Sequence, residues 1–317
     1  MRILFVTATR IGDAVLSTGL LSYLVERYPG ARLTIAAGPA AAPLFDSVPG
    51  LERLIVVEKR RWGAHWLPLY ARVAGRWDIV VDLRGSALAW LLLAGVRRVM
   101  AKGDANEHRV RQLARLFRLD PPPAPHLWTA PRHERAADAL LPPGPPVLAI
   151  GPAANWRGKQ WRAERFAELA DCLTRRDGLL PGARVAVMAA AHERAQALPL
   201  LAAMGDRAID LVGATDLLTA AAIVRRCAMF IGNDTGLMHI AAAIGTPTLG
   251  LFGPSPVEQY GPWGRLTAVA QTAVPRAALF GPDYDHRTTD TLMDSLSVAA
   301  AETAARALWR RAASAAA

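Results

Sequence analysis

The stretch GNDTGLMHIAAAIGTPTLGLFGPS, residues 232–255, places an acid, a hydroxyl and a glycine where an apolar run ends and a helical pattern begins. Asp234, Thr235 and Gly236 stand at this junction, and His239 follows one helical turn later. A helix N-terminus after a parallel strand attracts phosphate, because its free N–H groups and its dipole face the ligand. The junction therefore indicates a phosphate site, although aspartate is also a common N-cap and a histidine there is often only packed.

A second polar loop follows another apolar run in the same half of the chain. GPAANWRGKQW, residues 151–161, contains Lys159 shortly before a helical pattern begins. A lysine on such a loop can neutralise a phosphate, although a single loop lysine is more often a solvated surface residue. Two strand-end loops in the same half of the chain, one suited to an anion and one carrying a cation, together favour a site for a phosphate-bearing ligand.

A third strand end lies at the start of the chain, in TATRIGDAVLSTGLL. Asp13 falls in the first turn of the helix expected there, at the same kind of sheet edge. A carboxylate in that place can accept a proton from an attacking hydroxyl. A capping acid is the structural alternative.

Loops of this kind run from the carboxyl end of a parallel strand to the start of a helix, so strands and helices should alternate along the chain. Short apolar runs rich in β-branched residues, such as residues 3–7, 78–83, 147–152 and 229–234, alternate with amphipathic helical patterns, which predicts an α/β fold with sheets covered on both faces. A proline-dense segment, residues 120–146, divides the chain. We expect domains over residues 1–145 and 146–290, followed by a tail, residues 291–317, whose helix is capped by Ser297 and packs back on the first domain.

Length and composition further limit the kinds of partner and of site that the protein could have. The 317 residues are 52% hydrophobic and carry a formal net charge of +10, which favours an anionic partner such as a phosphate-bearing substrate or membrane surface. Nucleic acid is disfavoured, because no basic motif with interleaved aromatic residues is present. The two cysteines have no metal-type spacing, and no His, Asp and Glu cluster predicts a metal site. No signal peptide or apolar stretch of membrane-spanning length is evident, so we expect a cytoplasmic protein.

Four motifs together resemble glycosyltransferase family 9, the heptosyltransferases that build the inner core of lipopolysaccharide. They are RIGDAVLSTGLL, GPAANWRGKQW, GNDTGLMHIAAAIGTPTLGLFGPS and GPWG, and the similarity runs in the same order from residue 1 to about residue 310. The resemblance implies a GT-B architecture, in which two Rossmann-like domains face each other across a cleft. The acceptor is then expected on the N-terminal domain and the nucleotide sugar on the C-terminal domain.

The resemblance also assigns roles to individual residues. Asp13 matches the proposed general base, and Lys159 matches the lysine near the donor diphosphate. Glu193 falls near the acid for the ribose hydroxyls, and Thr215 falls near the backbone lining the adenine. The sequence departs from the family in having Arg162 where a proline is frequent, and in lacking a cysteine pair in residues 281–291. The donor-binding junction is matched by Asp234, Thr235, Gly236 and His239.

The implied reaction is an inverting, metal-independent sugar transfer without a cofactor, from a nucleotide sugar, expected to be ADP-heptose, to an anionic glycolipid of the lipopolysaccharide core. Arg60, Arg61 and Arg97 are candidate acceptor contacts in the basic first half. A monomer with peripheral, salt-sensitive contact to the inner membrane is expected.

Two other classes remain open at this point. One is a related GT-B sugar-nucleotide hydrolase or epimerase, which would need a further acid or base. The other is a non-catalytic nucleotide-binding or nucleic-acid-associated protein. Asp13 separates the transferase from the binding protein, since a binder has no use for a carboxylate at that position.

Overall fold

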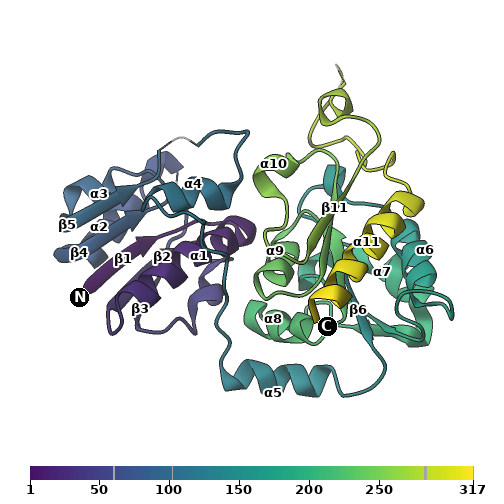
Figure 1. The fold of residues 1–317 in the computed structure, drawn as a ribbon. Helices are drawn as coiled ribbons and strands as arrows, with labels where there is room; N and C mark the ends of the chain where they lie inside the picture. The colour runs from purple at the N-terminus through teal and green to yellow at the C-terminus, as the bar shows by residue number, and fades with distance from the viewer. Residues whose placement is uncertain (60, 102, 282–283, 317) are drawn as a thin grey trace. The chain divides into compact units, whose positions relative to one another are not determined.

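The computed structural model describes residues 1–59, 61–101, 103–281 and 284–316 (Figure 1). The chain forms two compact units, Met1–Ala130 and Pro131–Ala317. The boundary lies 15 residues before the predicted one, because part of the proline-dense segment forms the helix α5 (Pro131–Leu140), which packs on α8 (Leu217–Arg225) of the second unit. Ion pairs from Glu134 to Arg225 and Arg226 fasten α5 there.

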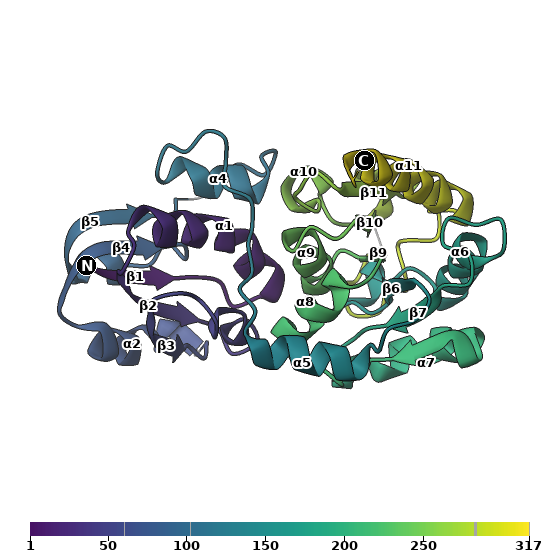
Figure 2. The same ribbon diagram turned by 60° about the horizontal axis from the view of Figure 1, so that its bottom comes forward.

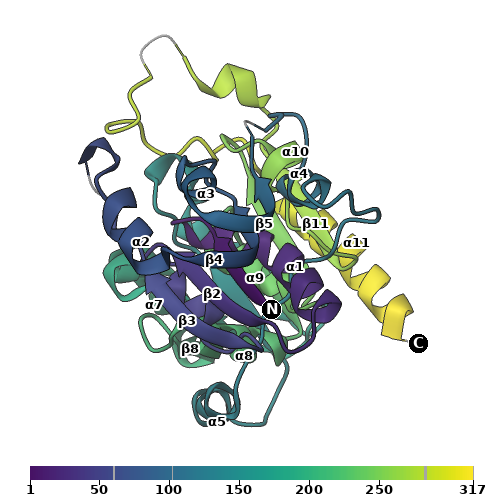
Figure 3. The same cartoon turned by 90° about the vertical axis from the view of Figure 1, so that its left-hand side faces the viewer.

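The first unit contains a five-stranded parallel sheet in the order β3-β2-β1-β4-β5. The helices α2 (Trp66–Val73) and α3 (Leu88–Leu91) share one apolar cluster with the sheet, and α1 (Ile11–Arg27) lies on the opposite face beside α4 (Arg109–Arg115) (Figure 3). The strands are β1 (Arg2–Val6), β2 (Arg32–Ala37), β3 (Leu51–Val56), β4 (Arg76–Asp82) and β5 (Leu93–Val99).

The second unit contains a six-stranded parallel sheet in the order β11-β10-β9-β6-β7-β8. One face packs against α6 (Ala163–Thr174), α7 (Arg194–Met204) and α11 (Val298–Ala316), and the other against α5, α8 and α9 (Gly236–Ala243) (Figure 2). The strands are β6 (Val147–Gly151), β7 (Arg184–Val187), β8 (Ala208–Asp210), β9 (Met229–Asn233), β10 (Thr248–Phe252) and β11 (Thr267–Gln271).

Short helical turns complete the described elements, several of them in loops that follow strands. These are α10 (Val257–Tyr260) and the 3-10 turns η1 (Ala42–Phe45), η2 (Arg61–Gly63), η3 (Arg157–Lys159), η4 (Ala191–Glu193), η5 (Gly205–Arg207) and η6 (Arg276–Leu279).

Burial on both faces explains why the central strands are continuously apolar. In β6, Leu148 and Ile150 enter the cluster beneath α6 and α11, whereas Val147 and Ala149 enter the cluster beneath α8 and α9. A strand covered on both sides has no polar face, so it lacks the alternation of a half-exposed strand. The predicted α/β class is confirmed.

The terminal helix α11 packs on the second unit. It contacts α6, β10 and β11, and its residues Ala301, Ala305 and Leu308 are fully buried in the core of that unit. The expectation that it packs back on the first domain stays a prediction. Its start follows the prediction, since the Ser297 hydroxyl accepts a hydrogen bond from the N–H of Ala300 at 3.2 Å.

Both sheets reverse their strand order at a central point. From β1 the chain proceeds outward to β2 and β3, then returns to β4 on the other side of β1; from β6 it proceeds to β7 and β8, then returns to β9. At such a switch point the loops after two neighbouring strands diverge to opposite faces, and ligands bind in the crevice that opens between them. The ends of β6 and β9 form this point in the second unit.

Candidate functional site

Lys159 and Asp234 meet at the switch point of the second unit. Gly151 ends β6 and pairs with Gly232 in β9, so the loops that follow these strands leave the sheet side by side. Lys159 ends η3 on the first loop, Asp234 directly follows β9, and Lys159 Nζ lies 2.6 Å from Asp234 Oδ2. The Asp234 side chain is 8% exposed and that of Lys159 25%, so this ion pair is largely shielded from solvent.

His239 faces the second oxygen of the Asp234 carboxylate. Its Nε2 lies 3.7 Å from Asp234 Oδ1, and its buried Nδ1 has no hydrogen-bond partner in the described part of the chain. Burial by itself raises the pKa of Asp234, but the hydrogen-bonding influence of His239 and the charge of Lys159 outweigh it and hold this pKa well below its usual range. Asp234 is therefore an anion that orients a cation on one side and an imidazole on the other.

Thr235 and Gly236 form the N-terminus of α9 beside this pair. Thr235 is the N-cap residue in an extended conformation, and its side chain makes no capping hydrogen bond. The first N–H groups of a helix have no partner within the helix, which makes them donors for an anion. A lysine ammonium and free helix amides thus lie at one strand end, an arrangement that suits a phosphate group.

Asn233 fixes the two loops to each other. Its fully buried side chain accepts a hydrogen bond from the Trp161 N–H at 3.1 Å and donates one to the Pro152 carbonyl at 2.7 Å. The sequence analysis assigned no role to this residue. An asparagine at the end of an apolar strand could have indicated one, because a buried amide must find hydrogen-bond partners. Here its partners lie across the switch point.

A segment near the end of the chain, residues 286–296, holds the Lys159 loop from outside; we call it the C-terminal clamp. The carbonyls of Gly158 and Gln160, on either side of Lys159, accept hydrogen bonds from the Leu292 N–H at 3.0 Å and the Thr291 hydroxyl at 2.5 Å. Because both neighbours of Lys159 are bonded, the backbone that aims its side chain at Asp234 is fixed. No local pattern in the sequence indicates this contact.

Side chains extend the contact between the clamp and the loop. The Trp156 ring stacks on His286 with centroids 5.1 Å apart, and Arg157 Nε donates to Asp290 Oδ1 at 2.7 Å. Arg162, where the family resemblance predicts proline, pairs with Asp290 and with Asp294, the latter at 2.6 Å. The arginine at this position therefore connects the loop to the clamp, which gives a structural reason for the departure.

Asp13 occupies the corresponding strand-end position in the first unit. It is the third residue of α1 and is half-buried, whereas Arg10 is the N-cap residue and makes no side-chain capping bond. Within the described residues Asp13 has no hydrogen bond and no ion pair. Its carboxylate is thus not the cap of the helix and is chemically uncommitted.

Comparison with known proteins places this arrangement in a family. Residues 84–282 match the model of glycosyltransferase family 9 (heptosyltransferase). The chain belongs to this family. Lipopolysaccharide heptosyltransferase 1 of Pseudomonas aeruginosa is 29% identical to it over 84% of this chain and 82% of the relative, and lipopolysaccharide heptosyltransferase 2 of Salmonella typhimurium is 26% identical over 80% and 83%.

Solved structures agree on the fold. The Escherichia coli ADP-heptose lps heptosyltransferase II matches with a TM-score of 0.74 at 22% identity, covering 99% of this chain and all of the other. A family 9 glycosyltransferase from Veillonella parvula matches with a TM-score of 0.78 at 20% identity, covering 98% and 97%. The protein is a glycosyltransferase, and the predicted GT-B arrangement of two Rossmann-like domains is confirmed as its fold class.

Two further donor residues predicted for this glycosyltransferase lie at neighbouring strand ends. Glu193 follows β7, and its Oε2 accepts a hydrogen bond from the Ala190 N–H at 3.0 Å. Thr215 follows β8 and precedes Asp216, whose carboxylate caps α8 through the Thr219 N–H at 2.7 Å. Both lie along the carboxyl edge of the sheet that carries Lys159, but neither contacts the Lys159–Asp234 pair, so their donor roles stay predictions.

The three arginines predicted to bind the acceptor differ in their environment. Arg60 lies outside the described residues. Arg61 is exposed at the start of η2. The guanidinium of Arg97 donates to the carbonyls of Ala89, Leu92 and Ala94, so it closes the turn between α3 and β5. Its contact with an acceptor stays a prediction, as does that of Arg61.

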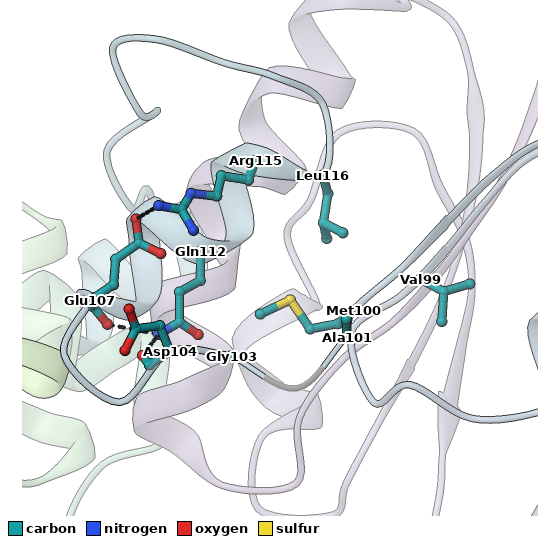
Figure 4. A pocket seen from close by; sticks show the side chains of 9 residues that line it. All are labelled: Val99, Met100, Ala101, Gly103, Asp104, Glu107, Gln112, Arg115 and Leu116. Atoms are coloured by element: carbon teal, nitrogen blue, oxygen red, sulfur yellow. Dashed lines mark hydrogen bonds and ion pairs between the residues drawn. The ribbon is translucent and has the colours of Figure 1, made fainter.

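One further cavity of the glycosyltransferase lies in the first unit, after β5. It has a volume of about 230 Å³ and is lined by the loop before α4 and by α4 itself (Figure 4). Glu107 pairs with Arg115 at 2.7 Å, and the Gln112 amide donates to the carbonyls of Asp104 and Glu107. These contacts hold the loop together.

No group of three His, Cys, Asp or Glu residues that would suit a metal occurs in the described part of the chain, nor does any helix there combine the length and hydropathy needed to span a bilayer.

Proposed function

We propose that this glycosyltransferase moves heptose from ADP-heptose to an anionic glycolipid acceptor of the lipopolysaccharide core. The observation that carries the proposal is the triad of Lys159, Asp234 and His239 at the N-terminus of α9, at the switch point of the second sheet. The names of relatives with comparable length, which are lipopolysaccharide heptosyltransferases, support the choice of donor and acceptor.

In the proposed reaction the acceptor hydroxyl oxygen attacks the anomeric carbon of the sugar while the bond from that carbon to the diphosphate oxygen breaks. Asp13 takes the hydroxyl proton, and attack opposite the leaving group inverts the anomeric configuration. ADP departs with the bonding electron pair. Lys159 and the free amides of α9 stabilise the negative charge that develops on its diphosphate.

Asp234 acts on this step through Lys159. Its carboxylate is buried and ionised, and its contact with Lys159 Nζ directs that side chain toward the end of β9. Glu193 and Thr215 are assigned to the ribose and the adenine. Arg61 is assigned to the charged groups of the acceptor.

We infer that the enzyme works as a monomer on the cytoplasmic side of the inner membrane, in peripheral contact with it. The test is a panel of ADP-, UDP- and GDP-sugars, assayed with wild type and with Asp13→Asn on a lipopolysaccharide-core acceptor. Transfer from ADP-heptose alone, lost in the variant, supports the proposal. Turnover with a different nucleotide sugar would overturn the donor, and turnover of Asp13→Asn near the wild-type rate would overturn the base.

A further inference from the structure

The five most exposed large apolar side chains in the described chain all come from one short stretch of the first unit. Each is between 65% and 101% exposed, and the next in rank, Leu198, is 51% exposed. Scattered apolar residues on a surface need no explanation, but a concentration of this kind marks a contact surface. We call this set the apolar face: Trp62, Leu67, Trp90, Leu91 and Leu93.

The elements that carry the apolar face follow one another in the chain and belong to one face and one edge of the first sheet. Trp62 belongs to η2, directly before α2, and the other residues belong to α2, α3 and the first position of β5. The inner sides of α2 and α3 enter one core cluster, and the Arg84 guanidinium stands 5.0 Å above the Trp66 ring, connecting α2 to the loop before α3. Figure 3 shows α3 beside β5, the edge strand of this sheet.

The backbone at Trp62 is unfavourable for a bulky residue. Its φ of 56° and ψ of 20° lie in the left-handed region, which is rare for large side chains. Such a conformation costs on the order of 1–3 kcal/mol, and it holds a fully exposed indole away from the rest of the protein. Packing within the protein does not explain the position of this tryptophan.

The net charge of the first unit indicates what kind of surface the apolar face contacts. Residues 1–130 contain 18 lysines and arginines against 10 acids, whereas residues 131–317 contain 19 against 17, so the first unit holds +8 of the net charge of +10. Lys59 and Arg61 are exposed next to Trp62 and make no ion pair within the described residues. A second copy of the same face would bring like charges together, whereas an anionic surface would be attracted.

We propose that the apolar face docks on the surface of an anionic lipid bilayer. The rings of Trp62 and Trp90 enter the headgroup region, where an indole has both apolar contact and a hydrogen-bond partner, and Lys59 and Arg61 contact lipid phosphates. This inference rests on the peripheral membrane contact of the proposed function and assigns that contact to named residues; it is independent of which sugar is transferred. It also changes the expected contact from a purely electrostatic one to one with an apolar component.

The experiment measures co-sedimentation of the full chain with vesicles of phosphatidylethanolamine and phosphatidylglycerol. The variant Trp62→Ser/Trp90→Ser removes both rings, and Leu198→Ser, an exposed leucine of the second unit, is the matched control. We expect the double variant to lose at least about tenfold in partitioning, and the control to bind as wild type does. Raised salt should weaken wild-type binding without abolishing it.

Vesicles of phosphatidylcholine alone test the contribution of lipid charge to binding, and wild type should bind them more weakly. A thermal shift with ADP should be the same in the double variant as in wild type, which separates loss of docking from loss of the donor site. If the serine variant is unstable, Trp62→Phe/Trp90→Phe replaces it, and quenching of tryptophan fluorescence by brominated lipid should fall relative to wild type.

Three results would overturn the proposal. One is sedimentation of the double variant to the wild-type extent, and another is absence of vesicle binding by wild type. The third is a wild-type dimer in light scattering that the double variant converts to a monomer, since this would make the apolar face an interface between copies.

Discussion

Lys159 Nζ lies 2.6 Å from Asp234 Oδ2 although 75 residues separate the two in the chain. The contact joins the loop after β6 to the end of β9, and it places one cation beside a helix N-terminus whose amides are free. The pair has two tasks that can be measured separately. It stabilises the fold by neutralising a buried carboxylate, and in the proposed function it presents a positive charge to the donor diphosphate.

Lys159→Ala should reduce both stability and donor binding. The buried Asp234 loses its cation, which we expect to cost about 1–3 kcal/mol of unfolding free energy, and the thermal shift produced by ADP should shrink or vanish. Urea unfolding and thermal-shift titration measure the two effects. The double variant Lys159→Ala/Asp234→Asn is the control: it should regain part of the stability but none of the ADP response. Full ADP response in either variant would remove Lys159 from the donor site.

Asp234 predicts a defined pH dependence of stability. Its pKa in the folded protein is below the unfolded value, so the stability that it contributes is present above about pH 4 and is lost as the pH falls toward the folded pKa. The difference in unfolding free energy between wild type and Asp234→Asn should therefore be largest near neutral pH and shrink below about pH 4. A difference that grows on acidification would contradict the ionised carboxylate.

Asp13→Asn should separate catalysis from folding. Asparagine keeps the shape of the side chain but cannot take a proton, so turnover should fall by roughly a hundredfold to ten-thousandfold. Melting temperature and the ADP thermal shift should match wild type, because Asp13 makes no hydrogen bond or ion pair within the described residues. Steady-state kinetics with a lipopolysaccharide-core acceptor decide the matter; a decrease of only a few-fold would leave another group as the base.

Loosening the C-terminal clamp should affect donor binding more than the chemical step. Asp290→Asn weakens the contact to Arg157, and Thr291→Val removes the hydroxyl that holds the Gln160 carbonyl. We expect the KM for the donor to rise by several-fold to about tenfold with a smaller change in kcat, because Lys159 is less well placed before the reaction begins.

The chain offers a matched control for Asp290→Asn. Asp171 pairs with Arg207 at 2.6 Å, its side chain is 58% exposed like that of Asp290, and it does not touch the Lys159 loop. Asp171→Asn should leave the KM for the donor unchanged. An equal rise in KM in both variants would assign the effect to general loss of ion pairing.

Cys227 should resist alkylation in the folded protein. Burial raises the pKa of its thiol to about 12, so almost no thiolate exists at pH 8. Mass spectrometry after iodoacetamide treatment should find Cys227 unmodified in native protein and modified in urea. Rapid native modification would show that α8 opens readily around this side chain.

The sequence predicted the parts of the molecule whose signals are local. Residues 147–152 and 229–234 are apolar, end in polar loops and form central strands, so β6, β9 and the residues after them were located correctly. The strands β5, β8 and β11 were not predicted; all three are edge strands, and nearly all of their residues are only partly buried or are exposed. Burial on one side only leaves less of a signature in the sequence.

The remaining differences involve contacts between distant residues. No local pattern relates Thr291 to Gln160, which lie 131 positions apart, so the clamp was not predicted. The same limit applies to Arg97: composition marks it as a candidate anion contact, and only the carbonyls around it reveal a structural role. The helix α11 was predicted as a helix, but its contacts with α6, β10 and β11 were not, because amphipathicity identifies a buried side without identifying its partner.

During synthesis the clamp is made later than the loop that it holds. The ribosome makes the chain from the N-terminus, so the first unit and the strand β6 emerge well before residues 286–296. Until those residues are available, the carbonyls of Gly158 and Gln160 lack their partners, and Lys159 is not held toward Asp234. A nascent chain therefore carries the Lys159 loop for some time before the segment that holds this loop in place has been made.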